Sequence, residues 1–180
     1  HSDKVYDLLR LIAFQIGQEV SLQELAIQLQ LSKNTVANYL DLLSKVFILF
    51  KVEGFSRNLR KEIIKSSRWY FYDDGIRNDM INNFNKIEKQ KDIGALWEKY
   101  LASKRIKKQH YQKIRTNNYF WRTYDQQELD WLEEKGDNLA GFEFKWNENR
   151  KAKIPTAFAK AYSEATFEVI NKQNYLDFIM

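Results

Sequence analysis

The chain has 180 residues, no cysteine, two histidines and a formal net charge of +5, with a sequence pI near 9.2. The lack of cysteine excludes disulfides and thiolate metal sites, and two histidines leave no adequate ligand set for zinc. No apolar run is long enough to span a bilayer and no leader pattern occurs, so we expect a cytoplasmic protein without a membrane segment. The basic balance suits an anionic partner such as nucleic acid, although most lysine-rich stretches are solvated surfaces.

The first third of the chain predicts three helices and a pair of strands. Apolar residues recur on one helical face between about residues 4 and 15. Ser21-Leu22-Gln23-Glu24 is a capping-box pattern that begins a second helix, and Ser32 is suited to cap a third. Strand-like runs at residues 47–52 and 69–72 follow. We therefore expect a helix-turn-helix with a two-stranded wing, that is, a winged helix.

If this winged helix binds DNA, the exposed start of its third helix and its wing supply the contacts. Polar side chains at the helix start would reach bases and phosphates, and basic side chains of the wing would contact phosphates. These residues are Lys33, Asn34, Thr35 and Asn38 in the helix, and Arg57, Arg60, Lys61 and Lys65 in the wing. The alternative stands beside this interpretation, because winged helices also serve as protein-contact or hinge modules.

The pattern changes in the second half, and we expect two domains, residues 1–78 and residues 79–180. The expected elements of the second domain are a helix at 94–104, strands at 109–124, 128–134 and 139–146, a helix opened by Pro155, and a strand at 166–170. Their order is αβββαβ, so the whole chain is expected to be an α+β protein.

Two acidic motifs lie on neighbouring expected strands. Asp130 ends the run Glu-Leu-Asp on the first of them, and Glu143-Phe144-Lys145 stands on the second. The turn at residues 134–138 contains glycine, aspartate and asparagine, which predicts a hairpin that brings the two strands together. Asp130 and Glu143 can then supply carboxylate oxygens to Mg2+ or Mn2+. Lys145 can orient or help deprotonate an attacking water and stabilise charge on a phosphate.

The αβββαβ order, with acids on the second and third strands, resembles the core of the PD-(D/E)xK nuclease superfamily. A narrower resemblance is to the uncharacterised C-terminal region of predicted prokaryotic AAA-type ATPases, in which a P-loop ATPase domain precedes a winged helix and a nuclease-like domain. The motifs that carry it are Trp121-Arg122-Thr123, Glu128-Leu129-Asp130-Trp131, Glu143-Phe144-Lys145, Asn58, the run 72–78 and Gly94-Ala95-Leu96-Trp97-Glu98. This resemblance implies a restriction-endonuclease-like fold and adds Glu98 as a metal ligand or supporting base.

Two residues depart from the pattern of that family. Lys99 stands where an asparagine commonly follows the glutamate, and Asp74 replaces a small residue before Gly75. Neither departure removes an expected metal ligand. No G-x-x-x-x-G-K-[ST] motif occurs, so we expect no ATP hydrolysis from this chain, which starts with His1-Ser2 and is expected to be a fragment.

Each site residue also has a purely structural interpretation. Glu-x-Lys on a strand is often a cross-strand ion-pair pattern, and Glu98 can be an exposed helix charge paired with Lys99 or with a residue one turn away. Glu128 is expected to accept hydrogen bonds from Arg122. The leading hypothesis is a DNA-binding region with a nuclease-like, Mg2+-dependent phosphodiesterase domain. The alternative is a catalytically inactive regulatory or protein-interaction module for its own ATPase domain or for a partner.

Overall fold

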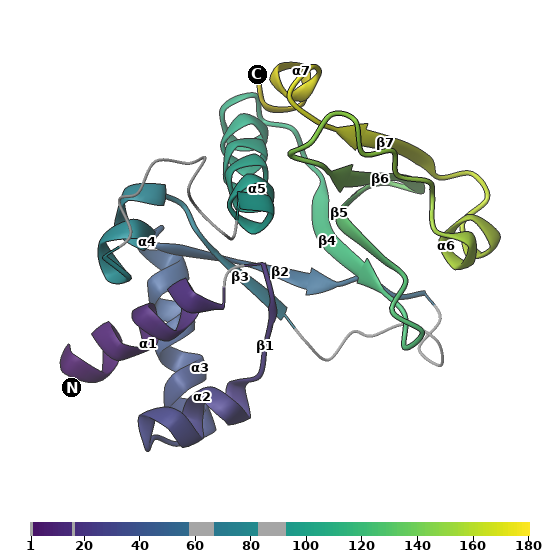
Figure 1. Cartoon of the computed structure of the whole chain (residues 1–180). Helices are drawn as coiled ribbons and strands as arrows, with labels where there is room; N and C mark the ends of the chain where they lie inside the picture. Colours follow the sequence, from purple (N-terminus) through teal and green to yellow (C-terminus); the bar gives the residue numbers. More distant parts are fainter. Residues whose placement is uncertain (1, 16, 58–66, 83–92) are drawn as a thin grey trace.

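The computed structural model of the chain is a mixed α+β fold built on one sheet (Figure 1). The structure describes residues 2–15, 17–57, 67–82 and 93–180. Within these ranges seven strands form the sheet, in the order β1-β3-β2-β4-β5-β6-β7, and most neighbours are antiparallel. The helices are α1 (Ser2–Phe14), α2 (Leu22–Leu29), α3 (Lys33–Lys45), α4 (Asp74–Met80), α5 (Ile93–Tyr111), α6 (Thr156–Ala161) and α7 (Tyr175–Ile179). The strands are β1 (Glu19–Val20), β2 (Leu49–Gly54), β3 (Ser67–Phe71), β4 (Asn117–Arg122), β5 (Glu128–Lys135), β6 (Asn138–Phe144) and β7 (Thr166–Ile170).

The predicted helix starts in the first third are confirmed. Ser21 Oγ accepts a hydrogen bond from the backbone N–H of Glu24 at 3.3 Å, and α2 begins at the next residue. Ser32 Oγ accepts one from the backbone N–H of Thr35 at 3.0 Å, and α3 follows. These serines satisfy amides that would otherwise lack a partner at the helix ends.

The expected pair of strands after α3 is also present. β2 and β3 pair antiparallel from Leu49 opposite Phe71 to Glu53 opposite Ser67, and the short strand β1 joins the other edge of β3. The expected linker motif at residues 72–78 is partly helical, because Asp73 caps α4 by accepting hydrogen bonds from the next turn.

The second half follows the expected order of elements, α5-β4-β5-β6-α6-β7, with one correction at a boundary. The helix α5 continues to Tyr111, whereas the sequence pattern predicted a strand from residue 109. Gln109 is buried in this helix, and its side-chain amide donates hydrogen bonds to Asn118 and Glu133 on the sheet. Tertiary contacts therefore extend the helix beyond the point that local pattern indicated.

The predicted hairpin between β5 and β6 is confirmed. The strands pair from Trp131 opposite Phe142 to Lys135 opposite Asn138, so the turn consists of two residues. Gly136 has a φ of +61° in this turn, a conformation that glycine adopts without steric cost.

The long helix α5 lies against one face of the sheet and packs on strands from both halves of the chain (Figure 1). Its cluster combines Phe50 and Tyr70 of the first half with Phe120, Phe142 and Phe144 of the second. The strands β2 and β4 pair in parallel, so the two predicted domains share a continuous sheet. The division at residues 78 and 79 stays a prediction. Among the described helices, none is both long and apolar enough to cross a bilayer.

Candidate functional site

A β-bulge positions the first acidic side chain of the candidate site. Tyr119 pairs with Leu132 and Trp121 with Leu129, so Asp130 and Trp131 stand together opposite one residue of β4. A bulge of this kind redirects side chains from the regular alternation of a strand. The Asp130 carboxylate lines a polar cavity together with Glu128 of the same strand.

The cavity has a volume of about 400 Å3 and lies between the first and second halves of the chain. It is lined by Gly17, Gln18, Glu19, Arg68, Glu98, Arg122, Glu128 and Asp130. Residues from β1, β3, β4, β5 and α5 thus meet at one place. The lining contains four carboxylates and two guanidinium groups, so ion pairing determines its internal structure.

Arg68 is the central cation of this cavity. It is only 4% exposed, and its Nη1 donates to Glu98 Oε1 at 3.1 Å while its Nη2 donates to Glu128 Oε2 at 3.3 Å. The guanidinium also lies 4.5 Å from the centre of the Phe120 ring. Burial alone would lower the pKa of Arg68, but the neighbouring groups Tyr70, Glu98, Asp130 and Glu128 together raise it above its ordinary value. Arg68 is therefore a permanent positive charge at this site.

Glu98 extends from α5 into the same cavity. Besides Arg68, it accepts a hydrogen bond from the Tyr70 hydroxyl at 2.5 Å. The turn before β1 lies against it, because a Cβ added to Gly17 would be 3.3 Å from Glu98 Oε2. Burial raises the pKa of Glu98 even though Arg68 and Tyr70 act in the opposite direction. The expectation of an exposed helix charge paired with Lys99 is therefore wrong.

Asp130 accepts a hydrogen bond from the backbone N–H of Phe144 at 2.8 Å. Burial raises its pKa well above the ordinary value, and the negative charges of Glu98 and Glu143 raise it further. Burial and the neighbouring negative charges thus both favour the protonated form of Asp130.

Glu143 and Lys145 do not line the cavity, although the charge of Glu143 acts on Asp130 and the charge of Asp130 acts on Lys145. They alternate with Phe142 and Phe144, whose rings pack in the cluster under α5, so the two charged side chains point to the opposite face. Lys145 Nζ lies 2.5 Å from Glu143 Oε1. Burial lowers the pKa of Lys145, but the contact with Glu143 and the charges of Asp130 and Glu128 outweigh it, and the pKa is raised.

The donor set has the right chemistry for Mg2+ or Mn2+, since all its acids offer oxygen atoms. Its arrangement does not fit such an ion. In the part of the chain that the structure describes, no group of three or more acidic or histidine side chains is placed to hold a metal. Glu98 is bound to Arg68 and Tyr70, Asp130 to a backbone amide, and Glu143 to Lys145. The acids are neutralised by side chains and protons of the protein itself.

The polar residues Glu19, Arg68 and Tyr70 of this site were not predicted from the sequence. The sequence held one signal, because Arg68 is a charged residue that directly precedes the apolar run Trp69-Tyr70-Phe71. The structure shows that Arg68 is buried. The predicted hydrogen bond between Arg122 and Glu128 is wrong. Arg122 Nη1 donates to Glu19 Oε1 at 2.7 Å, and Glu128 accepts its hydrogen bond from Arg68 instead.

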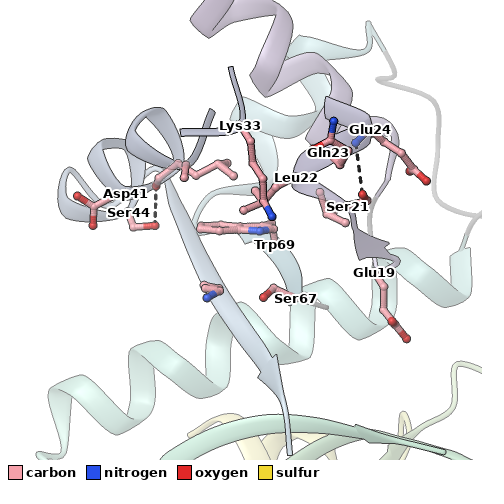
Figure 2. Close-up of a pocket in the computed structure, with 14 residues that line it drawn as sticks. Glu19, Ser21, Leu22, Gln23, Glu24, Lys33, Asp41, Ser44, Ser67 and Trp69 are labelled. Carbon is pink, nitrogen blue, oxygen red and sulfur yellow. Dashed lines mark hydrogen bonds between the residues drawn. The ribbon is translucent and has the colours of Figure 1, made fainter. Parts of the chain in front are cut away.

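A second and larger hollow, about 810 Å3, lies beside the start of α3 (Figure 2). Figure 2 shows the Lys33 side chain reaching toward the Trp69 ring, between α2 and β3. Lys33 and Lys51 line the hollow together with the acids Glu19, Glu24 and Asp41. Its charges are mixed, so the hollow is not a basic surface, and phosphate contact there would rest chiefly on Lys33.

The other predicted nucleic-acid contacts are distributed over different surfaces. Asn34 and Asn38 are exposed on α3, whereas Thr35 is half-buried and its hydroxyl shares a hydrogen bond with Ser32. Arg57 lies away from α3: its Nη2 donates to Glu134 Oε1 at 3.0 Å, and its backbone N–H donates to the Tyr162 hydroxyl. Arg60, Lys61 and Lys65 lie outside the described residues.

The two departures from the family pattern contact each other. Lys99 is completely buried, and its Nζ lies 2.5 Å from Asp74 Oδ1. Burial lowers the pKa of Lys99, and the carboxylate of Asp74 opposes this effect. A lysine in place of the common asparagine is thus matched by an acid in place of the common small residue.

Comparison with known proteins gives matches to two domains without assigned function. Residues 1–88 match the family described as "Domain of unknown function (DUF8612)", and residues 93–176 match "Domain of unknown function (DUF4143)". Two uncharacterized proteins, one from Mycobacterium bovis and one from Mycobacterium tuberculosis, are each 28% identical over 138 residues. The match covers 75% of this chain and 30% of each relative, so the chain spans under a third of their length. No solved structure matched significantly. The Arg68–Glu98 contact joins the two matched regions.

Proposed function

We propose that this chain is the winged-helix and nuclease-like region of a prokaryotic, cytoplasmic AAA-type ATPase, and that it binds DNA and carries a phosphodiesterase site. The observation that carries the proposal is the clustering of the four motif residues. Glu98 and Glu143 both raise the pKa of Asp130, and Asp130 in turn raises that of Lys145. Residues from one helix and two strands are therefore electrostatic neighbours, as the resemblance to PD-(D/E)xK nucleases implies.

The arrangement of the elements supports the same proposal. β4 pairs antiparallel with β5, β5 pairs antiparallel with β6, and β7 then pairs in parallel with β6. The helix α5 covers one face, and α6 packs in a separate cluster with Trp121 and Leu129. In the first half, β1 and β2 flank β3 beside three helices, which supports the winged-helix assignment.

The roles follow from the charges of the side chains. Lys145 keeps its proton at neutral pH because its pKa is raised, so it is suited to hold phosphate charge and is a poor base. Asp130 and Glu143 are the proposed oxygen ligands for Mg2+ or Mn2+, and Glu98 supports them. Because the observed arrangement does not fit the ion, we derive no catalytic step through it.

The test is cleavage of supercoiled plasmid in Mg2+ or Mn2+ by the wild-type chain and by Lys145→Ala, purified identically. The matched control is Lys135→Ala, an exposed lysine at the far end of β5. The proposal predicts nicking that Lys145→Ala removes and Lys135→Ala keeps. Equal nicking by all three proteins indicates a contaminating nuclease and contradicts the assignment of Lys145.

A second candidate is a catalytically inactive module that regulates its ATPase domain or docks on a partner. The ion pairs of Arg68 favour it, since they occupy Glu98, the acid proposed to support the metal ligands, and its neighbour Glu128. Fluorescence anisotropy with duplex DNA separates the candidates. DNA binding predicts an affinity that falls steeply with salt and weakens in Lys33→Ala, with Lys45→Ala at the other end of α3 as the control. No binding at about 50 mM salt favours the interaction module.

A further inference from the structure

We infer that Arg68 is the resident cation of the acidic cluster formed by Glu98, Glu128 and Asp130, and that it excludes a divalent metal from the cluster. The inference rests on the proposed function, because it explains how a nuclease-like set of acids is kept without an ion. It assigns to β3, a strand outside the nuclease-like half, direct control over that half.

The contacts of Arg68 resemble those of a bound cation. One guanidinium reaches a carboxylate on α5 and a carboxylate on β5, at 3.1 Å and 3.3 Å. Glu98 and Asp130 are both partly buried, so their negative charges are stabilised by a partner or a proton nearby. Arg68 is the partner that Glu98 and Glu128 share.

A metal and this guanidinium compete for the same oxygen atoms. Glu98 Oε1 already accepts hydrogen bonds from both Arg68 and Tyr70. A second positive ion within a few ångströms of Arg68 would be repelled, because the guanidinium is buried and weakly screened by solvent. Entry of the metal therefore requires Arg68 to withdraw.

The contact crosses the boundary between the two matched regions. Arg68, Tyr70 and Gly17 belong to residues 1–88, and the acids belong to residues 93–176. Withdrawal of Arg68 thus removes the ion pair between β3 and α5. Metal binding by the acidic cluster is therefore coupled to the contact between residues 1–88 and residues 93–176.

The experiment is titration of the chain with Mn2+ by isothermal calorimetry. The wild-type chain is expected to bind Mn2+ at Asp130 only weakly, with a Kd of about 1 mM or above, so cleavage of plasmid by the wild type requires metal concentrations above that value. Arg68→Gln, which removes the charge, is expected to tighten binding by about 10- to 100-fold, a usual range for coupled sites. Arg68→Lys keeps the charge and is the matched control, with an affinity close to that of wild type.

Folding of the variants is checked by circular dichroism. If Arg68→Gln does not fold because Glu98 is left without its partner, Arg68→Gln/Glu98→Gln replaces it. This double variant removes both charges together, which costs less stability than leaving one behind, and it keeps Asp130 and Glu143. Addition of Asp130→Asn to either variant is expected to abolish the gain in Mn2+ affinity.

The outcomes separate the inference from the proposed function. Micromolar Mn2+ binding by the wild type, lost in Asp130→Asn, overturns the inference and leaves the proposed metal site intact. An equal gain in Arg68→Lys and Arg68→Gln also overturns it, because the positive charge would then not be what excludes the metal. No binding by any folded variant overturns both the inference and the metal-dependent function.

Discussion

The buried ion pair between Asp74 and Lys99 allows a quantitative test of how strongly these two residues depend on each other. The perturbation is a double-mutant cycle of Asp74→Ser, Lys99→Asn and the combined variant, which replaces both charges by small or neutral polar side chains. Asp74→Ser alone leaves the ammonium of a fully buried lysine without its acid. Lys99→Asn alone leaves a carboxylate that is 44% exposed and can be hydrated. We expect the first change to cost more stability than the second.

The size of the coupling follows from separation and burial. At the observed 2.5 Å, Coulomb's law with an effective dielectric constant of about 20 gives an attraction of roughly 7 kcal/mol. Desolvation of Lys99 and solvent screening at the half-exposed Asp74 offset most of it, which leaves a coupling of about 1–3 kcal/mol. The pair Asp41 and Lys45 is the matched control: its atoms are 2.6 Å apart, but its side chains are 61% and 71% exposed. Its coupling is expected to be about 0.3–0.5 kcal/mol.

The assay is urea unfolding followed by tryptophan fluorescence, with the free energy of unfolding measured for all four members of each cycle. The combined variant is expected to be more stable than the sum of the single effects predicts. If the coupling of Asp74 with Lys99 is no larger than that of Asp41 with Lys45, burial does not strengthen the pair and the reasoning is refuted.

Two further predictions concern stability. Burial raises the pKa of Asp130 above its ordinary 3.8. The contribution of Asp130 to folding stability is therefore fully present below about pH 3.8 and is lost as the pH rises through the raised pKa. Asp130→Asn should therefore gain stability relative to wild type as the pH rises above about 4 in urea unfolding, and a difference that does not change with pH would contradict this. Glu133 accepts hydrogen bonds from Arg105, Gln109 and Trp131, so Glu133→Ala should cost about 3–5 kcal/mol, against about 1 kcal/mol or less for the control Glu134→Ala, whose ion pair with Arg57 is more exposed. Equal melting temperatures for these two variants would refute the role of Glu133.

Local chemistry made several elements predictable from sequence alone. Ser21 and Ser32 mark helix starts because their hydroxyls satisfy nearby backbone amides. Gly136 marks the hairpin between β5 and β6 because glycine accepts a positive φ. The acids Asp130 and Glu143 were assigned to neighbouring strands by the same reasoning, and both lie there. Each of these features depends on residues close together in the chain.

Features that depend on distant residues were not predictable in the same way. The end of α5 was placed too early because Gln109 is held by side chains of the sheet. Alternation could not indicate the bulge opposite Phe120, since a bulge adds a residue to one strand without changing its polarity pattern. The position of Arg57, against Glu134 and Tyr162, likewise follows from packing between the two halves.

The sequence by itself determined the class of elements, their order and the presence of Glu98, Asp130, Glu143 and Lys145 at motif spacing. Periodicity, capping and turn chemistry act over a few residues, so these properties can be predicted from the amino-acid sequence. Only the tertiary structure decided which charges meet. It brings Arg68 to Glu98 and turns Glu143 to the opposite face, because ion pairing in a buried cavity depends on which strands and helices pack together.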